Sequence, residues 1–137
     1  WFANAELLIK QHKYKEAFNL FDSISLVYPA NGLADEIFLR KGNAMYEQGF
    51  YQKSLDFYLK IIDNYPQEIL ADNAVYKVAE LYQFKLIDKQ KAIETYKKLL
   101  VDYPGSLFSD EARKRYRVLR GDKIVDDSNP EYRKWNN

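Results

Sequence analysis

Residues 54–66 read Ser-Leu-Asp-Phe-Tyr-Leu-Lys-Ile-Ile-Asp-Asn-Tyr-Pro, and this stretch decides the fold because its pattern occurs three times. The dipeptide Tyr-Pro stands at 28–29, 65–66 and 103–104, so successive copies are 37 and 38 residues apart. Counting back from each Pro, the twelfth residue is small, the eighth is aromatic and the fifth is aliphatic. These columns are Ala17, Ser54 and Ala92; Phe21, Tyr58 and Tyr96; and Ile24, Ile61 and Leu99. Their agreement in one phase identifies an internal repeat.

Apolar residues within each copy are spaced as on one face of a helix. Between Ser54 and Tyr65 they recur at intervals of three and four residues, which is the period of an α-helix that buries one side. Each stripe ends at a Pro, which lacks a backbone N–H and disfavours the helical conformation of the preceding residue. Further helices are expected after each Pro, over about 32–48, 67–85 and 106–120, with turns at 48–50 and 86–88. The sequence therefore predicts an all-α fold of seven helices, as three antiparallel pairs and one left over.

This arrangement resembles the tetratricopeptide repeat, in which a small and an aromatic residue lie four apart on the second helix and Pro follows eight residues later. The first helices show the likeness in the sets Trp1, Ala5 and Leu8; Phe38, Gly42 and Met45; and Val75, Ala79 and Tyr82. Lys41 departs from the pattern because it occupies a position that is usually apolar. The resemblance covers about residues 1–120. It implies an α-solenoid, in which each antiparallel helix pair buries one face by stacking on the next.

The chain is expected to divide into a repeat domain, 1–121, and a polar tail, 122–137. The repeats cover about 1–30, 31–67 and 68–105, followed by a capping helix at 106–120. In this last helix Arg113 and Arg117 replace the apolar or small residues of earlier repeats, as the exposed face of a terminal repeat requires. The tail contains little aliphatic content, so it is expected to be extended or poorly ordered.

The repeats are three or four residues longer than the usual 34. This longer, Tyr-Pro-terminated variety resembles the repeats of bacterial envelope proteins, such as outer-membrane assembly lipoproteins and periplasmic Tol-associated proteins. The likeness implies a larger parent protein and a periplasmic or outer-membrane-associated location. The chain begins with Trp1 rather than Met, so any targeting segment is expected outside it, as is any part that associates with a membrane.

Composition and motifs argue against catalysis. The 137 residues include 21 Lys and Arg against 20 Asp and Glu, so no bulk charge attracts polyanions. There is no Cys, His12 is the only His, and the five Gly form no phosphate-binding loop. The acidic group Asp122, Asp126 and Asp127 lacks the Gly and Glu of a calcium loop. We therefore expect no enzyme activity, cofactor, metal site or small-molecule substrate.

The resemblance implies a binding role. In tetratricopeptide arrays the first helices line a concave groove that receives peptides or extended protein segments. The residues expected to face this groove are Arg40, Asn43, Tyr46, Glu47, Tyr76, Lys77, Glu80 and Gln83. Tyr76 and Arg40 are the expected anchors, because aromatic and Arg contacts carry much of the binding energy at interfaces. The predicted function is thus a non-catalytic protein–protein interaction module whose partner is a protein or peptide segment.

Two alternatives remain open. The chain could be a purely structural solenoid segment that packs on upstream repeats of its parent. It could instead bind nucleic acid or an anionic surface through the basic helix 113–120. Steep salt dependence of binding would favour this alternative, since five phosphate contacts release counterions. Nucleic acid is disfavoured, because no aromatic residues are interleaved to stack on bases and the helix dipole itself favours cations near a C-terminus. The sequence does not indicate an oligomeric state.

Overall fold

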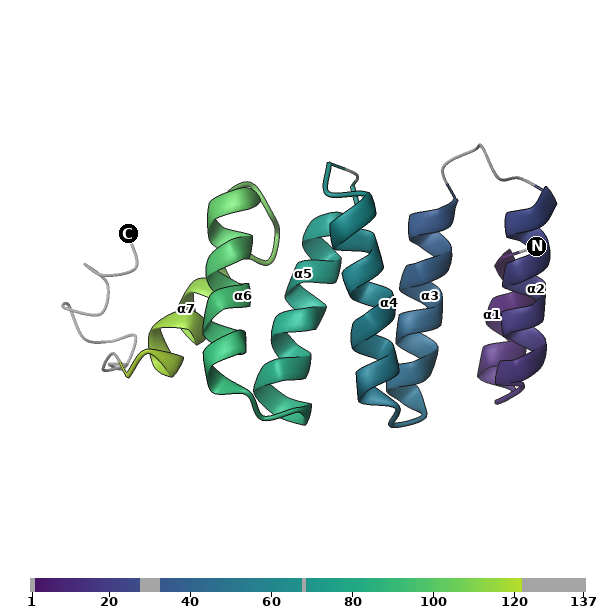
Figure 1. Cartoon of the computed structure of the whole chain (residues 1–137), viewed down its shortest axis with the longest axis horizontal. Coiled ribbons are helices and arrows are strands. Elements are labelled where there is room, and N and C mark those ends of the chain that lie inside the picture. The colour runs from purple at the N-terminus through teal and green to yellow at the C-terminus, as the bar shows by residue number, and fades with distance from the viewer. Residues whose placement is uncertain (1, 28–32, 68, 122–137) are drawn as a thin grey trace.

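The computed structural model describes residues 2–27, 33–67 and 69–121. Within these ranges there is no β-strand, and the helix pairs follow one another along the long axis of the molecule in chain order (Figure 1). They are α1 (Phe2–Lys10), α2 (Tyr14–Val27), α3 (Ala34–Glu47), α4 (Tyr51–Asn64), α5 (Ala71–Glu80), the π-helix η1 (Leu81–Lys85), α6 (Lys89–Asp102) and α7 (Ser109–Leu119). The prediction of an all-α helical solenoid is confirmed. The tail 122–137 lies outside the described residues.

The columns that define the repeat form the core of the second helices α2, α4 and α6. None of the nine small, aromatic and aliphatic residues is more than 2% exposed. At one crossing, Ser54 of α4 donates a hydrogen bond to the carbonyl of Gly42 on α3, at 2.8 Å. A Cβ on Gly42 would lie only 2.5 Å from Cε1 of Tyr58. The small residues therefore allow the two helices of a pair to approach closely, as the periodicity predicts.

The helices that follow each Tyr-Pro begin two to four residues later than predicted. The carbonyl of the fourth residue after each Pro accepts the first hydrogen bond of the helix, at 2.9–3.0 Å. The acceptor and donor residues are Leu33 and Ile37, Leu70 and Ala74, and Phe108 and Ala112. The first turns then carry acidic residues, including Asp35, Asp72 and Asp110, which the positive end of the helix dipole stabilises. Residues 105–107, between Pro104 and the Phe108 carbonyl, form the junction before α7.

Two side chains tie one such junction to the repeat before it. The hydroxyl of Tyr103 donates to the carbonyl of Pro66 at 2.7 Å. Ser106 donates to Asp72 at 2.7 Å and accepts from the backbone N–H of Phe108 at 3.1 Å. Tyr103 thus links two consecutive repeats, in addition to following directly on the end of α6.

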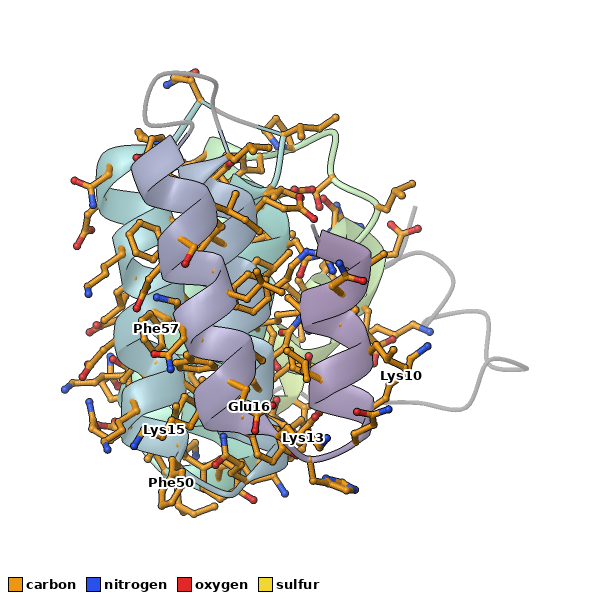
Figure 2. All side chains as sticks on the ribbon, turned by 90° about the vertical axis from the view of Figure 1, so that its right-hand side faces the viewer. Lys10, Lys13, Lys15, Glu16, Phe50 and Phe57 are labelled. Carbon is orange, nitrogen blue, oxygen red and sulfur yellow. The ribbon has the colours of Figure 1, made fainter. Side chains whose placement is uncertain are left out.

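Lys41, at its usually apolar position, is held between α2, α3 and α4. Its ammonium pairs with Asp22 at 2.5 Å and lies 5.5 Å and 5.9 Å from the ring centroids of Phe18 and Phe57. Figure 2 shows Phe57 beside α2, and its ring contacts that of Phe18 at a centroid distance of 6.1 Å. An ammonium is tolerated here because a carboxylate and two aromatic faces replace part of its hydration.

The π-helix η1 absorbs the extra residue of the longer repeat. In the α3–α4 pair, the small residue Ser54 follows the small residue Gly42 by twelve positions. In the α5–α6 pair, Ala92 follows Ala79 by thirteen positions. The wider turn of a π-helix takes up one residue while keeping the helix continuous, and η1 lies between Ala79 and Ala92. Both small residues therefore stay in phase and are fully buried.

Candidate functional site

The first helices carry a second pattern that the repeat columns do not include. Eleven residues after each Pro stands a basic residue, and these are Arg40 on α3, Lys77 on α5 and Arg115 on α7. Directly after each small residue of the first helices stand Glu6 on α1, Asn43 on α3 and Glu80 on α5. The structure places each residue of the second set near the basic residue of the following repeat. We call these three junctions the polar rungs.

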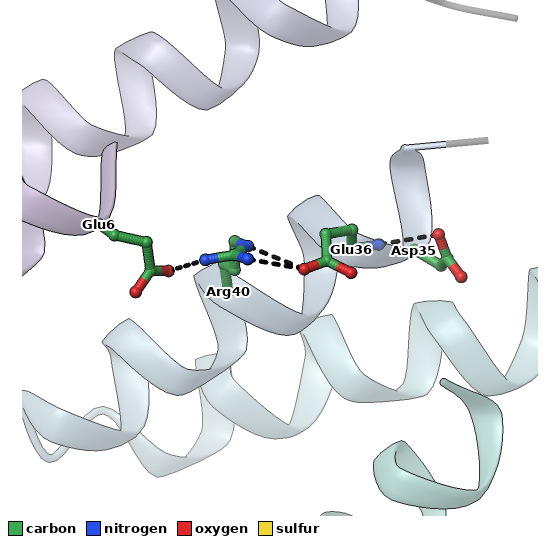
Figure 3. Close-up of polar contacts among 4 residues, drawn as sticks. All are labelled: Glu6, Asp35, Glu36 and Arg40. Carbon is green, nitrogen blue, oxygen red and sulfur yellow. Dashed lines mark hydrogen bonds and ion pairs between the residues drawn. The ribbon is translucent and has the colours of Figure 1, made fainter. Parts of the chain in front are cut away.

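The α1–α3 rung is an ion pair between neighbouring repeats. The Arg40 guanidinium donates to Glu6 across the junction, and to Glu36 on its own helix at 2.8 Å and 3.0 Å (Figure 3). The Arg40 side chain is 26% exposed. This side chain holds two carboxylates and joins α1 to α3, and its expected role as an anchor for a partner stays a prediction.

The α5–α7 rung is built in the same way. Arg115 donates to Glu80 at 2.9 Å, to Glu111 on its own helix at 3.2 Å, and to the hydroxyl of Tyr96 at 3.2 Å. Its guanidinium also lies 5.2 Å from the ring centroids of Tyr76 and of Phe84. Arg115 therefore fastens the last helix to the array through charge, hydrogen bonds and cation–π contact.

The α3–α5 rung differs, because Asn43 occupies the acidic position. Among the described residues no carboxylate lies within ion-pair distance of Lys77, whose ammonium is 5.9 Å from the ring centroid of Tyr58. The Tyr58 hydroxyl donates to Oδ1 of Asn43 at 2.6 Å. Burial raises the pKa of Tyr58 to about 12, so its hydroxyl remains a donor at neutral pH.

A pocket of about 330 Å³ opens at this rung, and we call it the α3–α5 pocket. Its walls come from α3, α4 and α5, and its lining residues are Asn43, Tyr46, Glu47, Tyr58, Lys77 and Glu80. The structure thus brings together five of the eight residues expected in the groove. Tyr46 is 40% exposed and packs edge-on against Tyr51 at a centroid distance of 5.4 Å. The pocket therefore offers an aromatic surface, an ammonium and an amide.

The other predicted groove residues have different environments. Tyr76 is only 8% exposed, stacks on Phe108 at a centroid distance of 4.6 Å, and meets Tyr96 edge-on at 6.2 Å. The expectation that Tyr76 is an exposed anchor is therefore wrong, because the next repeat covers its ring. Gln83 accepts a hydrogen bond from the Tyr96 hydroxyl at 2.6 Å, so its amide oxygen is engaged within the protein.

Sequence reasoning assigned Tyr58 to the core and missed that its hydroxyl reaches the pocket. It also counted Arg115 with the other cations of the last helix and missed its inward direction. The signal that could have found both is the basic column eleven residues after each Pro. That column shows that Arg115 corresponds to Arg40 and Lys77 rather than to its neighbours in the chain.

The cations of the basic last helix differ in their contacts. Arg113 pairs with Asp110 at 3.2 Å, Arg115 points into the array, and Arg120 donates to the hydroxyl of Tyr116 at 3.3 Å. Figure 2 shows further basic side chains, Lys10 and Lys13, near the turn between α1 and α2. Three of the five cations at 113–120 therefore make contacts within the protein.

The described ranges contain no cluster of three or more acidic or His residues placed to hold a metal ion. The acidic group at 122–127 lies outside them. Nor does any helix in the described part have the length and apolarity needed to cross a bilayer. His12, in the turn before α2, adopts a positive φ of 60° and hydrogen-bonds the Tyr14 hydroxyl at 3.0 Å.

Stacked antiparallel helix pairs with small and aromatic columns, and a polar pocket between successive first helices, define an α-solenoid of helical repeats. The tetratricopeptide repeat family model matches residues 36–68 and 73–106, which cover most of α3 with α4, and most of α5 with η1 and α6. Residues 36–68 and 73–106 therefore match two tetratricopeptide repeats, a module that generally mediates protein–protein interaction. No curated protein matches the chain significantly.

Proposed function

We propose that the chain is a non-catalytic interaction module that binds an extended protein segment along its first helices, centred on the α3–α5 pocket. The observation that carries the proposal is the pocket itself, which lies between first helices of successive repeats and is lined by Asn43, Tyr46 and Lys77. A solenoid exposes such a face over several repeats, so an extended segment can contact more than one. The groove residues Glu47 and Glu80 belong to the same surface.

The anchor in this proposal is Tyr46 rather than Tyr76. Tyr46 is 40% exposed, yet its ring is already positioned by Tyr51 and by Lys85, whose ammonium is 5.7 Å from the Tyr46 ring centroid. A positioned aromatic ring loses little entropy when a partner covers it. Tyr46 therefore fits the energetic centre of an interface, where aromatic residues are enriched.

The location proposed for the parent protein is the bacterial envelope, in the periplasm or at the outer membrane. Support comes from the repeat length alone, since the Tyr-Pro spacings of 37 and 38 residues resemble envelope repeats. Fractionation of cells that express the full-length protein tests it. Recovery from the periplasmic or outer-membrane fraction is expected, and recovery only from the cytosol would contradict it.

A displayed random peptide library tests the binding function. The full chain is immobilised, bound peptides are enriched, and the affinity of a synthetic enriched peptide is measured for wild type and variants. Tyr46→Ala should weaken binding by about tenfold or more, since it removes an interface aromatic. Val101→Ala is the matched control, because Val101 is 66% exposed on α6, and it should leave affinity unchanged. Enriched peptides that bind Tyr46→Ala as tightly as wild type would refute the proposed face.

A further inference from the structure

The three polar rungs are equivalent positions of one repeating structure, yet the middle rung is incomplete. The outer rungs each pair a Glu with an Arg, as Glu6 with Arg40 and Glu80 with Arg115. At the middle rung, Asn43 replaces the Glu and leaves Lys77 without a carboxylate among the described residues. An amide carries no charge, so it cannot neutralise an ammonium as the outer carboxylates neutralise their guanidinium groups.

Both groups at the middle rung offer hydrogen-bond donors to the pocket. Tyr58 donates to Oδ1 of Asn43, and this leaves the amide nitrogen of Asn43 to donate elsewhere. No acceptor within the described residues takes up that nitrogen. The Lys77 ammonium adds further donors from α5. A carboxylate accepts hydrogen bonds from both kinds of donor and also neutralises the charge.

The two acidic residues of the pocket do not fill this role. Glu80 is committed to Arg115 at 2.9 Å. Glu47 is exposed at the rim and lies near the Tyr14 hydroxyl, where burial and then the nearby Glu47 charge raise the pKa of Tyr14. Among the described residues, Lys77 is therefore left without a carboxylate within ion-pair distance between α3 and α5.

We propose, building on the function proposed above, that the partner segment inserts a Glu or Asp side chain into the α3–α5 pocket. Its carboxylate contacts Lys77 and the amide nitrogen of Asn43 and completes in trans the row of charge pairs. The outer rungs are filled by Glu side chains from helices at the same repeat offset. We therefore assign the position to an internal acidic side chain of the partner rather than to its C-terminal carboxylate.

The first test needs no partner. Asn43→Glu should complete the rung in cis, so its urea midpoint should exceed that of the matched variant Asn43→Gln. The gain should disappear when Lys77→Gln is combined with Asn43→Glu. If Asn43→Glu is no more stable than Asn43→Gln whether residue 77 is Lys or Gln, no carboxylate position is vacant beside Lys77, and the inference fails.

The second test uses peptides enriched on the full-length chain from a random library. Peptides that bind wild type should carry an acidic residue whose replacement by the matching amide weakens binding about tenfold. Lys77→Gln should cause a similar loss, and the two changes together should cost little more than either alone, since they remove the same contact. Lys97→Gln, an exposed lysine on α6, is the control and should have no effect.

Two further arms separate the possible outcomes. Amidation of the peptide C-terminus should leave affinity unchanged, and loss of binding on amidation would assign the carboxylate to the chain end and overturn the inference. Glu47→Gln should tighten binding, because it removes a like charge from the rim. Peptides that depend on Tyr46 but on no acidic residue would overturn this inference and leave the proposed function intact. Peptides whose binding depends on neither Tyr46 nor Lys77 would overturn both this inference and the proposed function.

Discussion

Gly42 lies where α3 crosses α4, and no side chain fits there. A Cβ at this position would be 2.5 Å and 2.8 Å from Cε1 and Cδ1 of Tyr58. Tyr58 cannot easily withdraw, since it is 2% exposed and its hydroxyl is tied to Asn43. Gly42→Ala should therefore lower the free energy of unfolding by about 1–3 kcal/mol, as overpacking does.

The matched control for this substitution is Gly105→Ala. Nothing lies within 4 Å of a Cβ built on Gly105, and its φ is not in the left-handed region. Its free energy of unfolding should stay within about 0.5 kcal/mol of wild type. Urea denaturation of both variants checks the pair. Equal effects would show that the approach of α3 to α4 is not set by the missing side chain.

Tyr76 stabilises the fold through its ring. It is buried between Phe108 and Tyr96, so Tyr76→Ala should cost about 3–5 kcal/mol, as truncation of a buried aromatic residue does. Tyr76→Phe keeps the ring and should cost less than about 1 kcal/mol. Thermal or urea unfolding measures both changes. A stable Tyr76→Ala variant would restore Tyr76 as an exposed groove residue.

Tyr58 and Tyr96 make stability depend on pH in the alkaline range. Burial raises the pKa of each to about 12 from the ordinary 10.0. Because the folded-state pKa lies above the unfolded-state pKa, the contribution of these two residues to stability is complete below about pH 10 and is lost as pH rises through about 12. Urea midpoints should fall across this window, and they should fall less steeply when both residues are replaced by Phe. The same slope in wild type and the double variant would contradict this assignment.

At the scale of the helix, α7 has one inward and one outward arginine two residues apart. The Arg115 side chain is 23% exposed and bonds Glu80, Glu111 and Tyr96. The Arg113 side chain is 39% exposed and pairs with Asp110, which is 95% exposed. Arg115→Ala should cost about 1–3 kcal/mol, since it breaks charge-assisted hydrogen bonds. Arg113→Ala should cost under about 0.5 kcal/mol.

Urea unfolding of the two variants compares them directly. The α7 helix should also lose protection from amide hydrogen exchange in Arg115→Ala, because the residue joins α7 to α5 and α6. Similar stabilities for both variants would mean that the α5–α7 rung contributes nothing measurable.

The elements were predictable from sequence to the extent that they follow a period. The columns of Ala17, Phe21 and Ile24 and their equivalents are buried as expected, because a helical stripe and its helix–helix contact are both local signals. The π-helix was not predicted as such, although the spacing of 38 residues contains its cause. A one-residue insertion can be accommodated in a turn or within a helix, and only packing decides between them.

The candidate site was predictable only where the position of a residue within the repeat is enough to determine the direction of its side chain. Asn43 and Tyr46 stand one and four residues after the small residue Gly42, and Lys77 stands two before Ala79, so all three side chains line the pocket. Tyr76 could not be placed in this way, since Phe108, which covers it, lies 32 residues further along the chain. Contacts made by the next repeat are decided by the stacking of helix pairs, which no local pattern encodes. The division into repeats at 1–30, 31–67 and 68–105 stays a prediction.

At the scale of the whole molecule, the row of helices combines interlocked apolar columns with polar rungs on the first helices. The outer rungs connect repeats to one another through Glu6 and Arg40, and through Glu80 and Arg115. The middle rung, with Asn43 and Lys77, leaves a pocket. Within these columns, the residues of the outer rungs are therefore assigned to stability, and those of the middle rung are assigned to binding. This separation allows the pocket to be altered while the array stays folded.

Binding of a protein segment at the α3–α5 pocket can be observed residue by residue through amide chemical-shift mapping. An enriched peptide is titrated into the isotope-labelled full-length chain, and the perturbed backbone amides are assigned. The largest shifts should occur at Asn43, Tyr46 and Lys77 and at their neighbours on α3 and α5. Shifts concentrated instead around Lys97 and Val101, on the exposed side of α6, would contradict it.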